Sequence, residues 1–319
     1  MKAVVFDSYG SVEVLQYREV EKPIAKPDQL LVQVHASSVN PVDWKIRQGY
    51  LQLLSGFNFP RIVGSDISGV VVEVGLDVTK FKPGDEVYTF LNPLTGGACA
   101  EYCVVPESVA SIKPQNITHA EAAAVPIAGL TALQALRDLG NIQAGKKVLI
   151  NGASGGVGIF AVQIAKAMNA EVTGVCSAKN RDFVKSLGAD IVLDYAEIDF
   201  TKQTQKYDII LDAVGNKTFA ECENVLQTEG VYISTLPSFD NLVPMFLSLF
   251  MSDKKAKLIV ANANDSDLGI LRELIESGKV NPIVDRTYSL EEVAAAHTYS
   301  ETGRAVGKIA ISIEEVISQ

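Results

Sequence analysis

A glycine-rich turn is the feature of this sequence that points most directly to chemistry. It spans residues 152–158, contains Gly155, Gly156 and Gly158, and joins an expected strand at 147–151 to an expected helix at 157–168. Glycines let the backbone approach a pyrophosphate closely, and the amides at a helix start stabilise its charge. The turn therefore predicts a dinucleotide site, although Ala153 stands where the usual pattern has its first glycine.

The end of the next expected strand, at 171–176, indicates which dinucleotide is bound. NAD-selective sites place a carboxylate there to hold the ribose hydroxyls. Here Ser177, Lys179 and Arg181 follow the strand, and no carboxylate occurs before Asp182. A hydroxyl and two cations suit a 2′-phosphate, so the sequence favours NADPH over NADH. The alternative is that Lys179 and Arg181 only solvate the start of a helix.

The elements that must position this turn change along the chain. Up to about residue 120, short β-branched runs separated by Pro and Gly predict a strand-rich lobe. From about residue 124, strands alternate with helical periodicity, which is typical of a parallel sheet covered by helices. The tail from Val280 onward, with a helix at 290–299 and a strand at 308–313, is assigned to the first lobe. Expected strands of the second lobe are 147–151, 171–176, 191–193, 208–212, 231–234 and 257–260.

Composition excludes several classes of function. A chain of 319 residues with 47% hydrophobic residues can fill two lobes, and its net charge of -10 opposes binding to nucleic acid and anionic lipid. The N-terminus lacks the apolar core of a secretory signal, and the longest apolar run, 243–251, is shorter than the roughly 20 residues of a spanning helix. The four cysteines match neither disulfide nor metal-site spacing. We expect a soluble, cytoplasmic protein with reduced, buried thiols and no membrane partner.

Short motifs follow one another in a fixed order along nearly the whole chain: SVNPVD at 38–43, VGSDISG at 63–69, KPGDEV at 82–87, GGACAEY at 96–102, GLTA at 129–132 and KSLGAD at 185–190. With the glycine turn, they resemble the medium-chain dehydrogenase/reductase superfamily, in its zinc-free quinone oxidoreductase and enone reductase branch. The resemblance implies an α/β fold. A GroES-like, β-rich catalytic domain would comprise residues 1–123 and 265–319, and a Rossmann NADPH-binding domain with a doubly wound parallel sheet would comprise residues 124–264.

The zinc ligands of the superfamily are replaced in this sequence. Zinc-dependent members carry a Cys and a Gly-His-Glu motif at the catalytic metal, where this chain has Asn40 and 64–66, Gly-Ser-Asp. Neither Asn40 nor Ser65 is a zinc ligand, and the loop with four structural cysteines is missing. We therefore expect no metal, and structural roles for His35, His119 and His297.

The resemblance also implies the site residues. Asn40 and Thr131 would contact the nicotinamide end, Ser177 and Lys179 would select the 2′-phosphate, and Tyr195 would line the adenosine side. Asn180 is an alternative to Lys179 as the counterpart of the family's basic residue. Core or loop packing is the alternative role for each, above all for the two residues expected beneath the cofactor. The remaining expected contacts are Ser154, Gly155, Gly156 and Val157 at the pyrophosphate, and Val214 and Leu236 along the sheet edge.

The predicted reaction is metal-free hydride transfer from NADPH to a quinone or an α,β-unsaturated carbonyl. Such acceptors take hydride at carbon while the charge moves to a distant oxygen, so no metal is needed to polarise a simple ketone. Lys45 could hydrogen-bond that oxygen, or it could pair with Asp66 or with solvent. No general acid is assigned, because an enolate can take its proton from water.

Other interpretations remain open in the sequence. The chain could be a non-enzymatic NADPH-binding or structural protein, as are crystallins recruited from this branch, although Asn40 and Thr131 favour an enzyme. A metal-dependent alcohol dehydrogenase would require stoichiometric zinc. The edge strand at 257–260 invites pairing with a second copy, and a homodimer is also implied by the resemblance. The substrate depends on segments such as 51–59 and 243–251, whose conformation the sequence leaves open.

Overall fold

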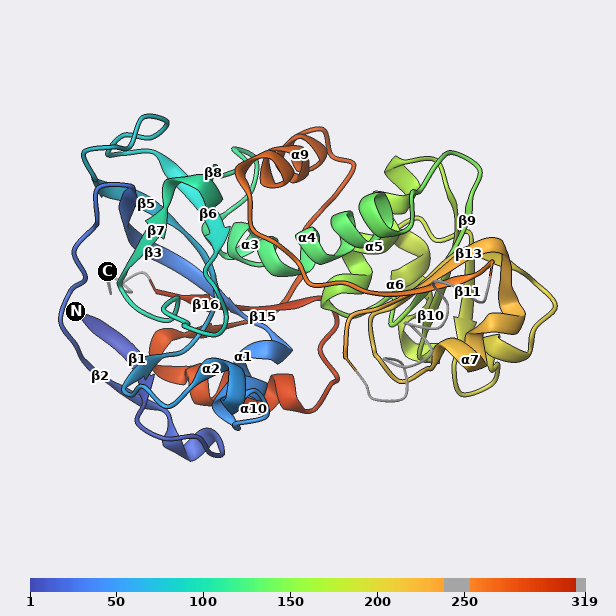
Figure 1. Ribbon diagram of the computed structural model, residues 1–319, viewed down its shortest axis with the longest axis horizontal. Helices are drawn as coiled ribbons and strands as arrows, with labels where there is room; N and C mark the ends of the chain where they lie inside the picture. Colours follow the sequence, from blue (N-terminus) through green and yellow to red (C-terminus); the bar gives the residue numbers. More distant parts are fainter. Residues whose placement is uncertain (238–252, 314–319) are drawn as a thin grey trace. The chain divides into compact units, whose positions relative to one another are not determined.

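The structure is a computed structural model that describes residues 1–237 and 253–313. The apolar run at 243–251 lies outside these residues. The chain forms two compact units (Figure 1). Unit 1 comprises Met1–Ile127, Ala263–Glu276 and Pro282–Gln319, and unit 2 comprises Ala128–Asn262 and Ser277–Asn281. No helix in the described ranges is long and apolar enough to cross a membrane.

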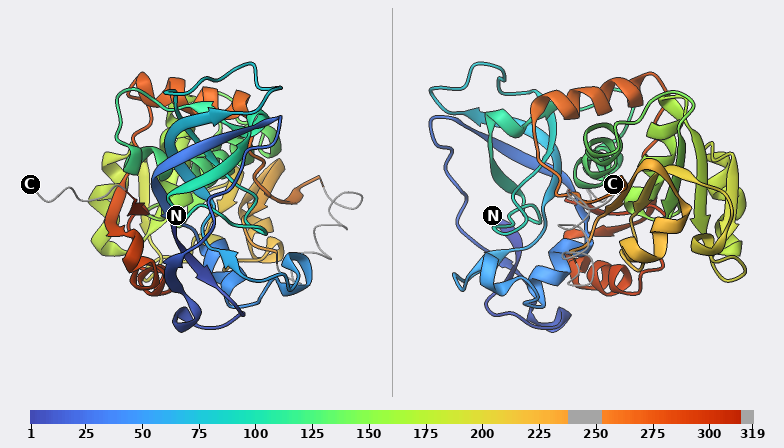
Figure 2. Two further views of the ribbon diagram at one scale, coloured as in Figure 1. Left: turned by 90° about the vertical axis from the view of Figure 1, so that its left-hand side faces the viewer. Right: turned by 45° about the vertical axis from the view of Figure 1, so that its right-hand side comes forward.

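Unit 1 is built on a seven-stranded sheet with the long strand β3 (Gln29–Val39) near its middle (Figure 2). The strand order is β15-β16-β3-β5-β6-β8, and β7 also pairs with β3. The alternating apolar residues of β3 and β5, such as Leu30, Val32 and Ile67, form its core. A smaller sheet has the order β2-β1-β4. The other strands are β1 (Lys2–Phe6), β2 (Gln16–Glu19), β4 (Arg61–Ile62), β5 (Asp66–Val74), β6 (Glu86–Phe90), β7 (Tyr102–Pro106), β8 (Ser111–Ile112), β15 (Val284–Ser289) and β16 (Lys308–Ser312).

The C-terminal strand β16 lies beside β3 although the two are far apart in the sequence. Their antiparallel register pairs Ile309 with Val39 and Ala310 with Ser38. This register brings Lys308, the first residue of β16, next to the end of β3, where Asn40 is the N-cap of helix α1 (Pro41–Arg47). The helices of unit 1 are α1 (Pro41–Arg47), α2 (Gln52–Ser55), α3 (His119–Ala123), α9 (Asp265–Glu276) and α10 (Val293–Glu301).

Unit 2 contains a six-stranded sheet in the order β11-β10-β9-β12-β13-β14, with every pairing parallel. Its first strand lies in the middle, which is the doubly wound order of dinucleotide-binding sheets. The predicted fold class is therefore confirmed. The strands are β9 (Lys147–Asn151), β10 (Glu171–Cys176), β11 (Ile191–Asp194), β12 (Tyr207–Asp212), β13 (Leu226–Ser234) and β14 (Lys255–Leu258). The helices are α4 (Pro126–Gln134), which begins in unit 1, α5 (Gly156–Ala167), α6 (Arg181–Ser186) and α7 (Phe219–Cys222).

Two strands, β13 and β14, differ from the prediction by more than one residue at a boundary. Strand β13 begins at Leu226 rather than at residue 231. Residues 227–229 are exposed and polar, so the sequence gives no hydrophobic signal for this part of the strand. Strand β14 spans Lys255–Leu258 rather than 257–260. Its lysines alternate with buried Ala256, whereas Val260 is 77% exposed and lies beyond the strand.

Two buried polar side chains of unit 1 come from α1 and α10. Arg47 is fully buried and donates to the Glu301 carboxylate, but its Nε and Nη1 atoms have no hydrogen-bond partner among the described residues. His297 is fully buried too, and within the same residues neither of its ring nitrogens is hydrogen-bonded. Burial, with a smaller effect of the Arg47 charge, lowers the pKa of His297 from 6.5 to about 3. The folded protein therefore holds this imidazole neutral.

We predict that His297 lowers the free energy of unfolding at acidic pH. Its pKa is lower in the folded state, so its contribution to stability is full above about pH 6.5 and is lost as the pH falls toward 3. Between pH 7 and pH 5 the free energy of unfolding should fall by about 2 kcal/mol from this residue. Urea denaturation of the wild type and of His297→Leu at both pH values measures this. An equal pH dependence in the two proteins would show that another group is responsible.

Candidate functional site

The glycine turn of unit 2 depends on a close approach between two backbone segments. Gly152 leaves β9 with a φ of 84°, and its carbonyl accepts a hydrogen bond of 3.0 Å from the Gly155 amide. A Cβ atom on Gly158 would lie 2.1 Å from the Gly152 carbonyl oxygen. Helix α5 can therefore pack against the end of β9 only if residue 158 is glycine.

Ala153 fits the turn despite departing from the usual pattern. It is fully buried, its φ is not positive, and its amide donates 2.9 Å to the Val175 carbonyl of β10. A methyl group is accommodated because it occupies the space next to Gly174, where a second Cβ would lie 3.0 Å away. The missing first glycine is thus compensated by a glycine on the neighbouring strand.

The start of α5 is open to an anion. Its N-cap is Gly155, which has no side chain to accept from the first amides, and its first turn contains no acidic residue. Helices α3 and α7 differ, since Thr118 with Glu121 and Thr218 with Glu221 form capping boxes there. The N-cap and first turn of α5 therefore do not compensate its first amides and positive dipole, which fits a pyrophosphate.

The residues after β10 lie beside this turn. The Asn180 side-chain amide donates 3.0 Å to Ser154 Oγ, which ties the two segments together. Arg181 lies 3.6 Å from the Glu197 carboxylate, so part of its charge is already compensated. Lys179 is exposed and has no ion pair in the described chain. Among the cations predicted for a 2′-phosphate, Lys179 is thus the more available one, with the half-buried Ser177 two residues before it.

The other expected cofactor contacts follow the carboxyl ends of the parallel strands. Tyr195 comes directly after β11 and is 65% exposed, and Val214 follows β12 and is 46% exposed. Val214 packs on the glycine turn, since its Cγ2 atom lies 2.7 Å from the position of a Cβ on Gly152. Leu236 follows β13 and packs on Gly215. Thr131 lies in α4, also in unit 2, and is 8% exposed.

Asp212, at the end of β12, was missed by the sequence analysis. Its buried carboxylate accepts from the amides of Val214, Gly215 and Lys217, and from the side chain of Asn151. It therefore holds the loop that carries Val214. The available signal was an acidic residue ending an apolar strand three residues before a glycine.

A second group of polar residues is buried in unit 1, at the junction of β3, α1 and β5. The Asn40 amide donates 2.8 Å to Asp43 Oδ2, and the Ser65 hydroxyl donates 2.6 Å to Asp43 Oδ1. Burial raises the pKa of Asp43 to about 6, although these two hydrogen bonds lower it. Asp43 is therefore a carboxyl group that can gain a proton near neutral pH.

Asp66 is the hub of this buried group. Its Oδ2 atom accepts from Ser38 Oγ at 2.6 Å and from Asn40 Nδ2 at 2.8 Å, and lies 3.4 Å from Lys308 Nζ. Its Oδ1 atom accepts from the Ile127 amide at 2.9 Å, at the start of α4. The Asp66 and Lys308 side chains are 0% and 4% exposed. Lys308 also donates to Asn40 Oδ1.

The structure corrects one expectation for Lys45. Of the alternatives for Lys45, pairing with Asp66 is not found, because the lysine that pairs with Asp66 is Lys308. The Lys45 ammonium lies 5.5 Å from the centre of the Trp44 ring, and partial burial lowers the pKa of Lys45. Its role as a donor to a substrate oxygen stays a prediction.

Zinc does not fit the donor set of unit 1. Asn40 and Asp66 are both bonded to the Lys308 ammonium, which would repel a divalent cation. The neighbouring thiol of Cys99 contacts Ser37 Oγ at 3.8 Å, and burial raises its pKa to about 12, so it is not a thiolate. Within residues 1–237 and 253–313, no group of three His, Cys, Asp or Glu side chains could hold a metal ion.

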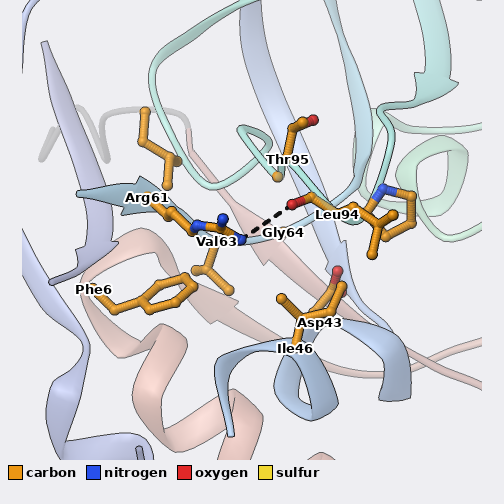
Figure 3. Close-up of a pocket in the computed structure, with 11 residues that line it drawn as sticks. Phe6, Asp43, Ile46, Arg61, Val63, Gly64, Leu94 and Thr95 are labelled. Carbon is orange, nitrogen blue, oxygen red and sulfur yellow. Dashed lines mark hydrogen bonds between the residues drawn. The ribbon is translucent and has the colours of Figure 1, made fainter. Parts of the chain in front are cut away.

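A small pocket of unit 1 reaches Asp43 (Figure 3). Phe6, Ile46 and Arg61 line it together with the 93–96 segment. The Arg61 guanidinium donates 3.2 Å to the Leu94 carbonyl and 2.8 Å to the Asn58 carbonyl, so it fixes two loops at the rim. Asn40 and Lys45 are not among the lining residues.

Known proteins resemble the chain over its whole length. Residues 26–115 match the alcohol dehydrogenase GroES-like domain, and residues 187–311 match a family described as zinc-binding dehydrogenase. The chain is 37% identical over 322 residues to the chloroplast envelope quinone oxidoreductase homolog of Arabidopsis thaliana, with 98% of each chain covered. It is 36% identical over 327 residues to the 2-methylene-furan-3-one reductase of Solanum lycopersicum, covering 98% of this chain and 79% of that one.

Solved structures agree with these relatives. The quinone oxidoreductase from Coxiella burnetii superimposes with a TM-score of 0.91 and 31% identity over 98% of this chain and 99% of its own. The Escherichia coli quinone oxidoreductase complexed with NADPH gives a TM-score of 0.84 and 25% identity over 98% and 100% of the two chains. The chain belongs to the medium-chain dehydrogenase/reductase superfamily, as its motifs predicted. It has the fold of a nicotinamide-dependent oxidoreductase and is similar to quinone oxidoreductases.

We predict opposite effects on stability for two glycine substitutions in helices. Gly158→Ala should lower the free energy of unfolding by several kcal/mol, because its Cβ would lie 2.1 Å from a backbone oxygen. Gly269→Ala, in α9, should raise it by about 1 kcal/mol, because a Cβ there meets nothing within 4 Å and alanine favours the helix. Thermal and urea unfolding measure both. A Gly158→Ala protein as stable as the wild type would refute the close packing.

Proposed function

We propose that the protein is an NADPH-dependent quinone oxidoreductase or enone reductase that transfers hydride without a metal. The observation that carries the proposal is the buried cluster of Asn40, Asp66 and Lys308. By the motif resemblance, Asn40 and Asp66 are the counterparts of the Cys and of the last residue of the Gly-His-Glu motif at the metal of zinc-dependent members. A site with this donor set suits acceptors that delocalise charge themselves. Bound NADPH would supply the hydride.

The named relatives support two classes of acceptor. The Arabidopsis and Coxiella proteins are named as quinone oxidoreductases, and the tomato protein is named for an α-methylene ketone, which is an α,β-unsaturated carbonyl. Both classes accept hydride at carbon and move an electron pair to an oxygen. Asn40 and Lys45 are the proposed residues near that oxygen, and the final proton comes from solvent.

NADPH is proposed over NADH because of the residues after β10. Ser177 supplies a hydroxyl, and Lys179 supplies a charge that has no ion pair within residues 1–237 and 253–313, while the Asn180 side chain donates to Ser154. The pyrophosphate would lie on Ser154, Gly155, Gly156 and Val157 at the open start of α5. Thr131, Tyr195, Val214 and Leu236 complete the proposed cofactor contacts.

A homodimer and a cytoplasmic location are also part of the proposal. Strand β14 is the last strand of the described sheet in unit 2, and such an edge offers unpaired backbone groups to a second copy. The acidic net charge of -10 supports a protein that works away from anionic lipid. The Arabidopsis relative is named for the chloroplast envelope, so the location is a prediction of this sequence and not of its relatives.

We predict that the purified protein oxidises NADPH when a quinone or a 2-alkenal is added. Nicotinamide absorbance reports turnover, and simple ketones and primary alcohols with NADP⁺ serve as negative substrates. Addition of a zinc chelator should leave the rate unchanged. Absence of oxidation with every acceptor would favour the non-enzymatic NADPH-binding protein, and activity lost to the chelator would favour a metal enzyme.

We predict that Lys179→Glu weakens NADPH binding by about 10- to 100-fold, because a charge-assisted hydrogen bond to the 2′-phosphate contributes roughly 1.5–3 kcal/mol. NADH binding should change little. Lys202→Glu is the matched control, since Lys202 is another exposed lysine of unit 2 with a side chain that is 82% exposed. Fluorescence titration with both nucleotides measures the constants. Equal losses of affinity for NADPH and NADH would show that Lys179 does not contribute to the selectivity of the site.

A further inference from the structure

The Lys308 and Asp66 side chains form a buried ion pair that stability alone does not explain. They are 4% and 0% exposed and their charged atoms are 3.4 Å apart. Burying an ammonium and a carboxylate costs solvation free energy that their attraction often only offsets, and apolar residues of similar volume can stabilise such a place as well or better. A retained buried pair is therefore a candidate for a role in the chemistry of its neighbours.

The neighbour on which both charges act is Asn40. Lys308 can only donate, and it donates to Asn40 Oδ1. Asp66 receives donors from Ser38, Lys308 and the Ile127 amide, so it acts as an acceptor toward Asn40 Nδ2 at 2.8 Å. The two charges thus determine which end of the amide is oxygen and which is nitrogen, and they fix its plane.

The same contacts leave Asn40 with one donor to spare. Its backbone amide is used by Asp43, its Oδ1 by Lys308 and one Nδ2 hydrogen by Asp66. The second Nδ2 hydrogen has no partner among the residues that the structure describes. An ammonium on Oδ1 withdraws electron density from the amide, and hydrogen bonds in such a chain strengthen one another. The spare N–H is therefore a better donor than it would be without the Lys308 ammonium on Oδ1.

We infer that Lys308 is a positioning residue that holds and polarises Asn40, so that the spare Asn40 N–H stabilises the negative charge on the acceptor oxygen. This inference rests on the proposed function. Hydride adds to a carbon of the acceptor, the π electrons shift, and the oxygen gains the charge as an enolate or hydroquinone anion. Asn40 keeps its proton and only hydrogen-bonds that oxygen, and water later protonates the product. The Lys308 ammonium supplies positive charge indirectly, through Asn40, whereas zinc supplies it in metal-dependent members.

The test separates this role from a purely structural one. Lys308→Gln keeps a donor for Asn40 Oδ1 but removes the charge, and Lys308→Arg keeps the charge. Lys113→Met is the matched control, since Lys113 is also buried in unit 1, at 5% exposed, but donates to the Pro114 and Ile117 carbonyls and pairs with Glu86. For each folded variant, kcat and KM with an acceptor that the wild type reduces are measured, together with the NADPH dissociation constant.

The expected result is a kcat about 10- to 100-fold lower in Lys308→Gln than in the wild type. This decrease is smaller than the decrease in kcat when a whole oxyanion donor is removed. KM and the NADPH dissociation constant should stay within about twofold of the wild-type values. Lys308→Arg should recover part of the rate, and Lys113→Met should keep the wild-type kcat. In an Asn40→Ala background, Lys308→Gln should have no further effect, because Lys308 acts through Asn40.

Two outcomes overturn the inference. One is a folded Lys308→Gln protein with the kcat of the wild type, and the other is the same loss of kcat with and without the Asn40 side chain. If Lys308→Gln does not fold, Lys308→Arg with and without Asn40→Ala carries the same comparison. A wild-type protein that fails to oxidise NADPH with every acceptor tested refutes the proposed function instead, so the two failures are distinguishable.

Discussion

The buried carboxylate of Asp66 is the constraint on which unit 1 depends. A charge with no exposed surface must be compensated within the protein, and here four groups from separate parts of the chain compensate it. They come from the end of β3, the start of α1, the start of α4 and the first residue of β16. Loss of any one leaves a buried charge short of a partner, so the demand of a single side chain fixes the mutual geometry of these elements.

The two units handle polar groups in opposite ways. In unit 1 the amide, hydroxyl, carboxylate and ammonium groups around Asn40 bond to one another and leave one Asn40 Nδ2 hydrogen over, so this donor is already held in place by the protein. In unit 2 the N-cap of α5 has no capping side chain and its first turn has no acidic residue, so its first amides can bind an external anion. Unit 1 thus offers a side-chain donor held in place by its neighbours, and unit 2 offers backbone amides at a helix start. Both kinds of donor can stabilise a negatively charged ligand.

Local patterns carried most of the fold prediction. The bounds of β9 and β10 and the glycine turn followed from apolar runs and glycine spacing, because these features depend on neighbouring residues. The polar start of β13 and the lysine-rich edge strand β14 gave a weaker signal. Lys308 could not be recognised as part of the site, since its partner Asn40 is 268 residues away and the lysine stands at the start of an otherwise apolar strand. Asp43 and Asp212 were missed for the same reason, because only the folded chain shows what they bind.

The position of β16 affects the order in which this molecule can be assembled. A ribosome releases Asn40 and Asp66 long before Lys308, so the nascent N-terminal segment holds an acidic residue destined for burial without its cationic partner. All of the described strands of unit 2 precede that partner, whereas unit 1 needs a strand that begins 242 residues after Asp66. Such distant pairing is slow to form. The strands of the unit with the dinucleotide-binding fold can thus be complete while the unit that holds Asn40 still lacks one of its strands.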